Sequence, residues 1–111
     1  MLNEAVALDR VGGDVSLLQE VAQLFLEDYP HSLSAIESAL AHGDAKALER
    51  AAHTLKGAVA NFGVEPVVQA ALALEMSGRA NDLSTCELQL ADLKAKLAIL
   101  HQDLAALSAA A

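Results

Sequence analysis

The sequence predicts an all-α fold: an antiparallel up-down four-helix bundle preceded by a short N-terminal helix. Hydrophobic residues make up 54% of the 111 residues but aromatic residues only 3%, which is typical of a core built from leucine, alanine and valine. No segment alternates apolar and polar residues over more than a few positions, as a half-buried strand would. Apolar residues recur instead at spacings of three and four, so they share one face of a helix.

Glycine, aspartate and proline mark the boundaries of the predicted helices. Gly12-Gly13-Asp14 and Gly43-Asp44 each combine a glycine that ends one helix with an aspartate that can cap the next. Pro66 suits the first turn of a helix, and Ser84-Thr85-Cys86-Glu87 fits a capping box. These signals predict helices at about 3–10, 14–42, 44–62, 66–79 and 84–107.

Pro30 leaves two interpretations of the segment 14–42: one helix kinked near the proline, or two separate helices. The apolar residues keep a spacing of three or four across the proline: Leu18, Ala22, Phe25, Tyr29, Leu33, Ile36 and Leu40. A full break would usually reset this spacing. We therefore favour one long helix kinked near Pro30.

The last predicted helix carries two series of residues spaced by seven. They are Leu83, Leu90, Leu97 and Leu104, and Cys86, Leu93, Leu100 and Leu107. Such a pattern forms the seam of a bundle whose helices cross at about 20°. It also makes the single cysteine a core residue. We expect one domain over 1–111, with the short helix at 3–10, the bundle at 14–107 and a frayed, alanine-rich tail at 108–111.

Composition also excludes several classes of function. The net charge of −8 lacks the basic footprint that binding to nucleic acid or to an anionic membrane requires. No apolar run approaches the ~18 residues of a membrane span, and the first residues, Met1-Leu2-Asn3-Glu4, lack the basic start of a signal peptide. We therefore expect a cytoplasmic domain without direct membrane contact.

The most informative residues are His53, Lys56 and Gly57. Residues three and four apart lie on one helix face, so these three form a single surface patch. A glycine inside a helix costs about 1 kcal/mol relative to alanine, which this chain uses freely elsewhere. The missing side chain at Gly57 therefore indicates a need for clearance.

A helical wheel separates this patch from the core. At about 100° per residue, the apolar stripe lies opposite His53. It consists of Leu48, Ala52, Leu55, Val59 and Phe62, whereas the side of His53 carries Lys46, Glu49, Arg50, Lys56, Gly57 and Ala60. His53 should therefore face solvent from the middle of a long helix.

The residues alone leave two interpretations of His53. One is a solvated histidine without a special role. The other is a nucleophile, because a neutral imidazole can attack near pH 7 and the Lys56 ammonium can hold phosphoryl oxygens as a point charge.

The residues around His53 read Ala52-His53-Thr54-Leu55-Lys56-Gly57-Ala58, followed by Asn61-Phe62-Gly63. This pattern resembles the signature of the histidine-containing phosphotransfer (HPt) domains of bacterial multistep two-component phosphorelays. Further similar segments lie at 13–30, 39–44, 74–75 and 78–79, so the resemblance covers about 11–107.

The resemblance implies a four-helix bundle whose exposed histidine carries a phosphoryl group between receiver-domain aspartates. By position, His53 is the phosphoacceptor, Lys56 stabilises the phosphoryl group and Gly57 gives access. Glu75 matches a position where family members often carry glutamine, and it would orient the ring by accepting a hydrogen bond from Nδ1–H. For Arg79 we favour an exposed charge at a helix end over a phosphate ligand.

The implied partners are response-regulator receiver domains and, where the domain is part of a longer chain, a parent hybrid histidine kinase. The domain would then be the cytoplasmic part of a membrane-bound sensor kinase. We expect a monomer that carries phosphohistidine as an intermediate and has no kinase activity of its own. The chain has no acidic cluster suited to Mg²⁺ and no glycine-rich nucleotide loop, so no cofactor is expected and Mg²⁺ should come with the receiver.

Two alternatives stay open: a module that docks receivers without transferring phosphate, and the phosphoacceptor domain of a chemotaxis-type histidine kinase. A metal-binding bundle would need inward glutamates and Glu-x-x-His pairs, which the sequence lacks. His31, His42 and His101 are widely spaced and fit solvated or turn positions. We also expect Val6, Leu8 and Val11 to add apolar contacts to a docked receiver.

Overall fold

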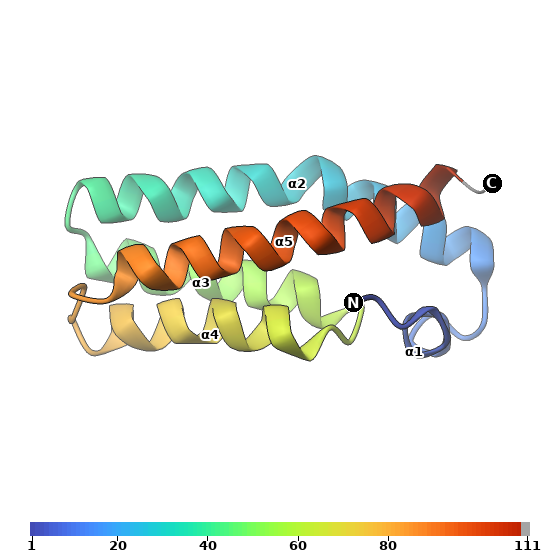
Figure 1. The fold of residues 1–111 in the computed structure, drawn as a ribbon, viewed down its shortest axis with the longest axis horizontal. Coiled ribbons are helices and arrows are strands. Elements are labelled where there is room, and N and C mark those ends of the chain that lie inside the picture. The colour runs from blue at the N-terminus through green and yellow to red at the C-terminus, as the bar shows by residue number, and fades with distance from the viewer. Residues whose placement is uncertain (110–111) are drawn as a thin grey trace.

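The computed structural model of the protein describes residues 1–109, and the elements in that range are all helices (Figure 1). They are α1 (Glu4–Asp9), α2 (Val15–Ala41), α3 (Ala45–Ala60), α4 (Glu65–Arg79) and α5 (Cys86–Ala109). Successive helices from α2 to α5 run in opposite directions (Figure 1). The predicted all-α, antiparallel four-helix bundle with a short N-terminal helix is confirmed.

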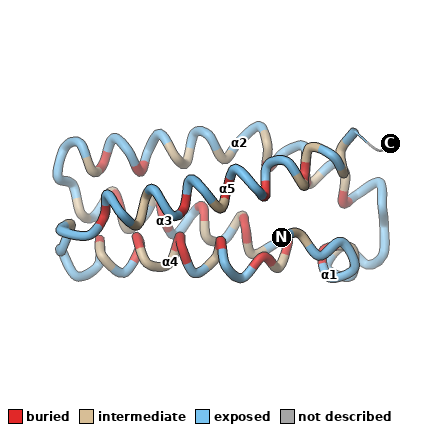
Figure 2. The backbone as a smooth tube through the Cα atoms, in the orientation of Figure 1, coloured by how far each residue is buried: buried red, intermediate tan, exposed pale blue. Residues whose placement is uncertain are grey.

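The four long helices form a ring. α3 packs against α2 and α4, and α5 packs against the same two helices from the other side. Figure 2 shows the buried positions of each helix turned toward the interior of this ring. Short connections force this neighbour-to-neighbour packing, as they do in other up-down bundles.

The helix starts follow the predicted capping signals at two aspartates. Asp14 accepts a hydrogen bond from the backbone N–H of Leu17, and Asp44 accepts one from Ala47. Pro66 lies in the first turn of α4. The capping box predicted at 84–87 does not form, because the Ser84 hydroxyl donates instead to Asp82 Oδ1 at 2.6 Å, and α5 begins only at Cys86.

Most of the predicted core positions are buried, and the rest are partly buried: Tyr29, Leu33, Leu40, Leu83, Leu90 and Leu107. The stripe of α3 and the middle of α5 are almost inaccessible to solvent, with Leu48, Leu55, Leu93 and Leu104 at 0% exposure. Pro30 lies inside one continuous α2, as the unbroken apolar spacing indicates. Cys86 belongs to the core, and burial raises the pKa of its thiol.

The C-terminal end differs from the predicted frayed tail. α5 continues through Ala109, two residues beyond the expected end at 107; residues 110–111 lie outside the described part of the chain. Alanine favours the helix intrinsically. Two side chains of α2 also hold this end, because Gln19 donates to the carbonyl of Leu107 and Ser108 donates to Gln23.

The short helix α1 packs at the end of the bundle beside the α3–α4 turn. A side chain at Gly63 would lie 2.9 Å from Val6 and 3.0 Å from Arg10, which shows how closely α1 approaches. Val6 is 41% exposed, whereas Leu8 and Val11 are partly buried against the core. Only Val6 of the three expected docking residues is thus largely open to a partner.

Within residues 1–109, no helix is long and apolar enough to span a membrane.

Candidate functional site

His53 lies in the middle of α3, and its side chain is 66% exposed. The neighbouring core residues Ala52 and Leu55 are fully buried. The helical period alone therefore turns the imidazole away from the core, as the wheel predicts.

Glu75 on α4 lies directly beneath the imidazole. Its side chain is only 3% exposed, and its Oε2 lies 3.1 Å from His53 Nδ1. Its other oxygen, Oε1, lies 2.7 Å from the ammonium nitrogen of Lys56. One buried carboxylate thus contacts both the histidine and the lysine that the sequence pattern singles out.

These contacts keep Glu75 ionised. The contact with the Lys56 ammonium lowers the pKa of the carboxyl most, and the hydrogen bond from His53 lowers it further, whereas burial acts in the opposite direction. An ionised carboxylate can only accept hydrogen bonds. Nδ1 of a neutral His53 therefore carries the proton, and Nε2 keeps a free electron pair.

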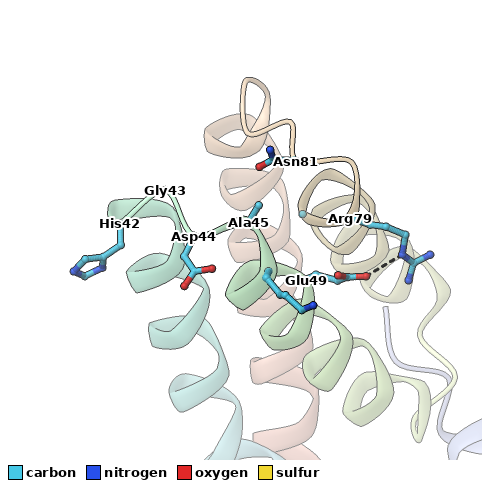
Figure 3. Close-up of a pocket in the computed structure, with 9 residues that line it drawn as sticks. His42, Gly43, Asp44, Ala45, Glu49, Arg79 and Asn81 are labelled. Atoms are coloured by element: carbon cyan, nitrogen blue, oxygen red, sulfur yellow. Dashed lines mark hydrogen bonds and ion pairs between the residues drawn. The ribbon is translucent and has the colours of Figure 1, made fainter.

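Arg79 extends the charged cluster across the α3–α4 interface. Its guanidinium donates to Glu75 Oε2 at 3.0 Å and to Glu49 Oε2 at 2.9 Å. Figure 3 shows the contact of Arg79, at the end of α4, with Glu49 on α3, beside an open hollow at the α2–α3 turn. Arg79 is the last residue of α4 and is 56% exposed, as expected of a charge at a helix end. In addition, its ion pair with Glu75 joins it to the site.

Sequence reasoning missed Glu49 as a member of this cluster. The spacing of four between Glu75 and Arg79 on one helix was a usable signal for their pair. No local pattern predicts which residue of α3 meets Arg79, because that depends on how the two helices are placed.

Gly57 leaves open space on the face of His53. A Cβ atom built there would have no neighbour within 4 Å. Gly57 therefore does not serve packing within the chain, which agrees with a role in clearance for a partner.

An apolar groove lies on the other side of His53, between α2 and α3. It has a volume of about 300 Å³ and is lined by residues that include Val21, Leu24, Phe25, Thr54, Ala58 and Asn61. Leu24 is 57% exposed and Leu17, two turns before it on α2, is 41% exposed. A polar, charged side toward α4 and an apolar side toward α2 thus flank the histidine.

Among residues 1–109, no three histidine, cysteine, aspartate or glutamate side chains gather closely enough to hold a metal ion. His31, His42 and His101 are exposed at separate places on α2, after its end, and on α5. His101 accepts or donates one hydrogen bond with the Tyr29 hydroxyl, at 2.7 Å.

Comparison with known proteins found one matching family and one similar crystal structure. The sequence model of a family described as "Hpt domain" matches residues 20–110. The fold is similar to the crystal structure of histidine-containing phosphotransfer protein B from Pseudomonas aeruginosa PAO1, with a TM-score of 0.91. That match has 23% sequence identity and covers 99% of this chain and 96% of the other. A search of curated proteins found no match.

Proposed function

The chain belongs to the Hpt domain family, whose members are phosphotransfer modules of phosphorelays, and from this premise we propose that His53 is its phosphoacceptor. In this proposal, Nε2 of His53 takes a phosphoryl group from the aspartyl phosphate of a receiver domain and passes it to another receiver. The observation that carries the proposal is the contact between Nδ1 and the buried, ionised Glu75. It directs the free electron pair of an exposed ring toward solvent.

The proposed transfer exchanges one bond for another. Nε2 attacks phosphorus in line with the acyl oxygen of the receiver, so a phosphorus–nitrogen bond forms as the phosphorus–oxygen bond breaks. The receiver's aspartate leaves as a carboxylate, and the reverse step returns the phosphoryl group to an aspartate. Such a loose transition state needs mainly positioning and charge stabilisation.

The neighbours of His53 fit these two needs. Glu75 holds the ring through Nδ1–H and sets the tautomer. Lys56 supplies positive charge beside the ring and offsets the charge of Glu75. Gly57 leaves the space through which the receiver reaches Nε2. The receiver would bring the Mg²⁺ that neutralises the transferring oxygens.

The groove between α2 and α3 gives a receiver an apolar surface next to the histidine. Exposed leucines beside a groove are a recurrent mark of protein-binding surfaces. Leu17 and Leu24 lie on this side of the molecule, and Val6 on α1 adds to the exposed apolar residues. We propose that the receiver contacts this surface while its aspartate faces His53.

The proposal is tested by incubating the chain with a panel of receiver domains that carry a labelled phosphoryl group. We expect acid-labile, base-stable label on the wild-type chain and none on His53→Gln, with both proteins equally helical by circular dichroism. His31→Gln is the matched control, because it removes another exposed histidine and should keep the label. Label retained on His53→Gln would refute the site.

The same panel separates the two alternatives. A module that only docks would bind receivers with measurable affinity yet never acquire label. A chemotaxis-type phosphoacceptor would be labelled from ATP by a histidine-kinase core.

A further inference from the structure

We propose that Arg50 is the side chain that binds the phosphoryl oxygens on His53, an inference that rests on the proposed function of His53. Arg50 lies three residues before the histidine on α3 and is exposed. Residues three apart are neighbours on a helix surface. The proposal adds a phosphoryl-binding residue that the His-x-x-Lys-Gly pattern does not contain.

A hollow of about 390 Å³ lies beside the imidazole on the side of Arg50. Its lining consists of Glu49, Arg50, His53, Thr54, Glu75 and Arg79, and does not include Lys56. Side chains of a helix lean toward its N-terminus, so the imidazole lies over the turn that precedes His53. A phosphoryl group on the ring should therefore lie toward this hollow, although Lys56 and Gly57 follow His53 in the sequence and lie on its other side along the helix.

The other cations of the site are already engaged. The Lys56 ammonium is held 2.7 Å from Glu75 Oε1, and its side chain is 25% exposed. Arg79 is bound to both Glu49 and Glu75. Thr54 uses its hydroxyl proton on the backbone carbonyl of Arg50. Within residues 1–109, Arg50 forms no ion pair with a carboxylate.

The charges of the cluster point to the same residue. Two carboxylates, Glu49 and Glu75, balance the two cations Lys56 and Arg79. Arg50 therefore gives the cluster as a whole a net positive charge, and it lines the hollow. A guanidinium is also the side chain best shaped for two parallel hydrogen bonds to phosphoryl oxygens.

In the transfer step, Arg50 makes and breaks no covalent bond. It donates hydrogen bonds to two phosphoryl oxygens while Nε2 replaces the leaving group on phosphorus. Its effect should appear with any phosphoryl donor, because it acts on the transferred group rather than on the receiver.

The test uses phosphoramidate as a small donor, so that receiver docking plays no part. Nε2 displaces ammonia from phosphorus, and labelling is followed by ³¹P NMR. We expect Arg50→Gln to label at least about tenfold more slowly than the wild type, because it loses the hydrogen bonds of a charged donor to the phosphoryl oxygens. Arg50→Lys, which keeps the charge but not the planar fork, should recover part of the rate.

Lys46→Gln is the matched control. Lys46 is an exposed cation seven residues before His53, on the same face of α3 but about 10 Å away along the helix axis. This variant changes the net charge as Arg50→Gln does and should label within about twofold of the wild type. Equal slowing in both variants would overturn the proposal, because the effect would then be one of overall charge.

A second measurement reports contact directly. In the ¹⁵N-labelled chain, phosphorylation of His53 should shift the side-chain Nε–H resonance of Arg50 and leave that of Arg10 on α1's C-terminal side unchanged. An unshifted Arg50 resonance, or a wild-type labelling rate in folded Arg50→Gln, would refute the role of Arg50 and leave the proposed function intact. Absence of label on the wild-type chain from both phosphoramidate and the receiver panel would refute both.

Discussion

Glu75 is the residue on which the geometry of the site depends. A buried charge is tolerated only where opposite charges and hydrogen bonds compensate for its lost hydration. Here His53, Lys56 and Arg79 all contact the same carboxylate. The residue that contacts the histidine is therefore also part of what holds α3 against α4.

At the residue scale, we predict that Glu75→Gln lowers the free energy of unfolding by about 1–3 kcal/mol at pH 7, because it removes charged hydrogen bonds in a buried place. The pKa of Glu75 is lowered in the folded protein from its ordinary value of 4.5. Its stabilisation is therefore complete above that value and is lost as pH falls through the folded pKa. Urea unfolding at several pH values should show the gap between the two proteins narrowing below pH 4.5.

The control for this variant is Glu20→Gln, which removes an exposed carboxylate from α2. It should change stability by less than about 0.5 kcal/mol. A gap between wild type and Glu75→Gln that stays constant under acid conditions would contradict the lowered pKa.

At the scale of elements, Gly57 on α3 and Gly78 on α4 have different surroundings: Gly57 faces open space, whereas Gly78 lies at the contact between the two helices. A Cβ atom at Gly78 would lie 2.7 Å from the carbonyl oxygen of Ala45 and 2.7 Å from the backbone nitrogen of Glu49. Gly78 thus sets how closely α4 approaches α3. Glu75 lies one turn earlier on α4, so this close approach brings its carboxylate beneath His53.

We predict opposite effects of alanine at these two glycines. Gly57→Ala should raise the free energy of unfolding by about 0.5–1 kcal/mol, because alanine favours the helix and the added methyl meets open space. Gly78→Ala should lower it by about 1–3 kcal/mol, because the methyl group forces the helices apart. Urea denaturation followed by circular dichroism measures both.

Receiver binding tests the role of Gly57 separately from stability. A phenylalanine at Gly57 should leave the bundle folded and abolish receiver binding. Destabilisation by Gly57→Ala would show that the glycine serves the fold rather than access.

At the scale of the whole molecule, the bundle presents His53 on an exposed helix face, and no cluster of histidine, cysteine or acidic side chains suited to a metal ion gathers within residues 1–109. The net charge of −8 is spread over the surface as single carboxylates and ion pairs rather than gathered into a cation-binding cluster. In the proposed reaction, the receiver would bring the Mg²⁺.

This leads to a prediction about metal removal. Adding EDTA should leave the melting temperature of the chain and the lifetime of its isolated phosphohistidine unchanged, but should stop transfer between the chain and a receiver. Thermal melts and label decay with and without EDTA measure the first part. A lifetime that changes with Mg²⁺ in the absence of a receiver would mean that this chain binds the ion itself.

Much of the fold could be read from periodicity because the helix period is a local property. The spacing of three and four identified the buried stripe of α3 and the exposure of His53, and it showed that α2 continues through Pro30. The ends were less predictable: Asp82 competes for Ser84 at the start of α5, and Gln19 and Gln23 secure its last turn. The contact of Asp82 with Ser84 is local but competes with the capping pattern, whereas the contacts of Gln19 and Gln23 join residues far apart in the sequence, whose proximity no local pattern reveals.

The sequence by itself determined which residues form helices, which face of each helix is buried, and that His53, Lys56 and Gly57 share an exposed face. Glu75 became a candidate only through resemblance to a family. Tertiary structure alone decided that its carboxylate meets Lys56 and Arg79, that Glu49 completes the bridge, and that Arg50 borders the hollow beside the ring. The reason is physical: periodicity fixes rotation about one helix axis, whereas these contacts depend on the distance and the axial offset between two helices, which packing at Gly78 sets.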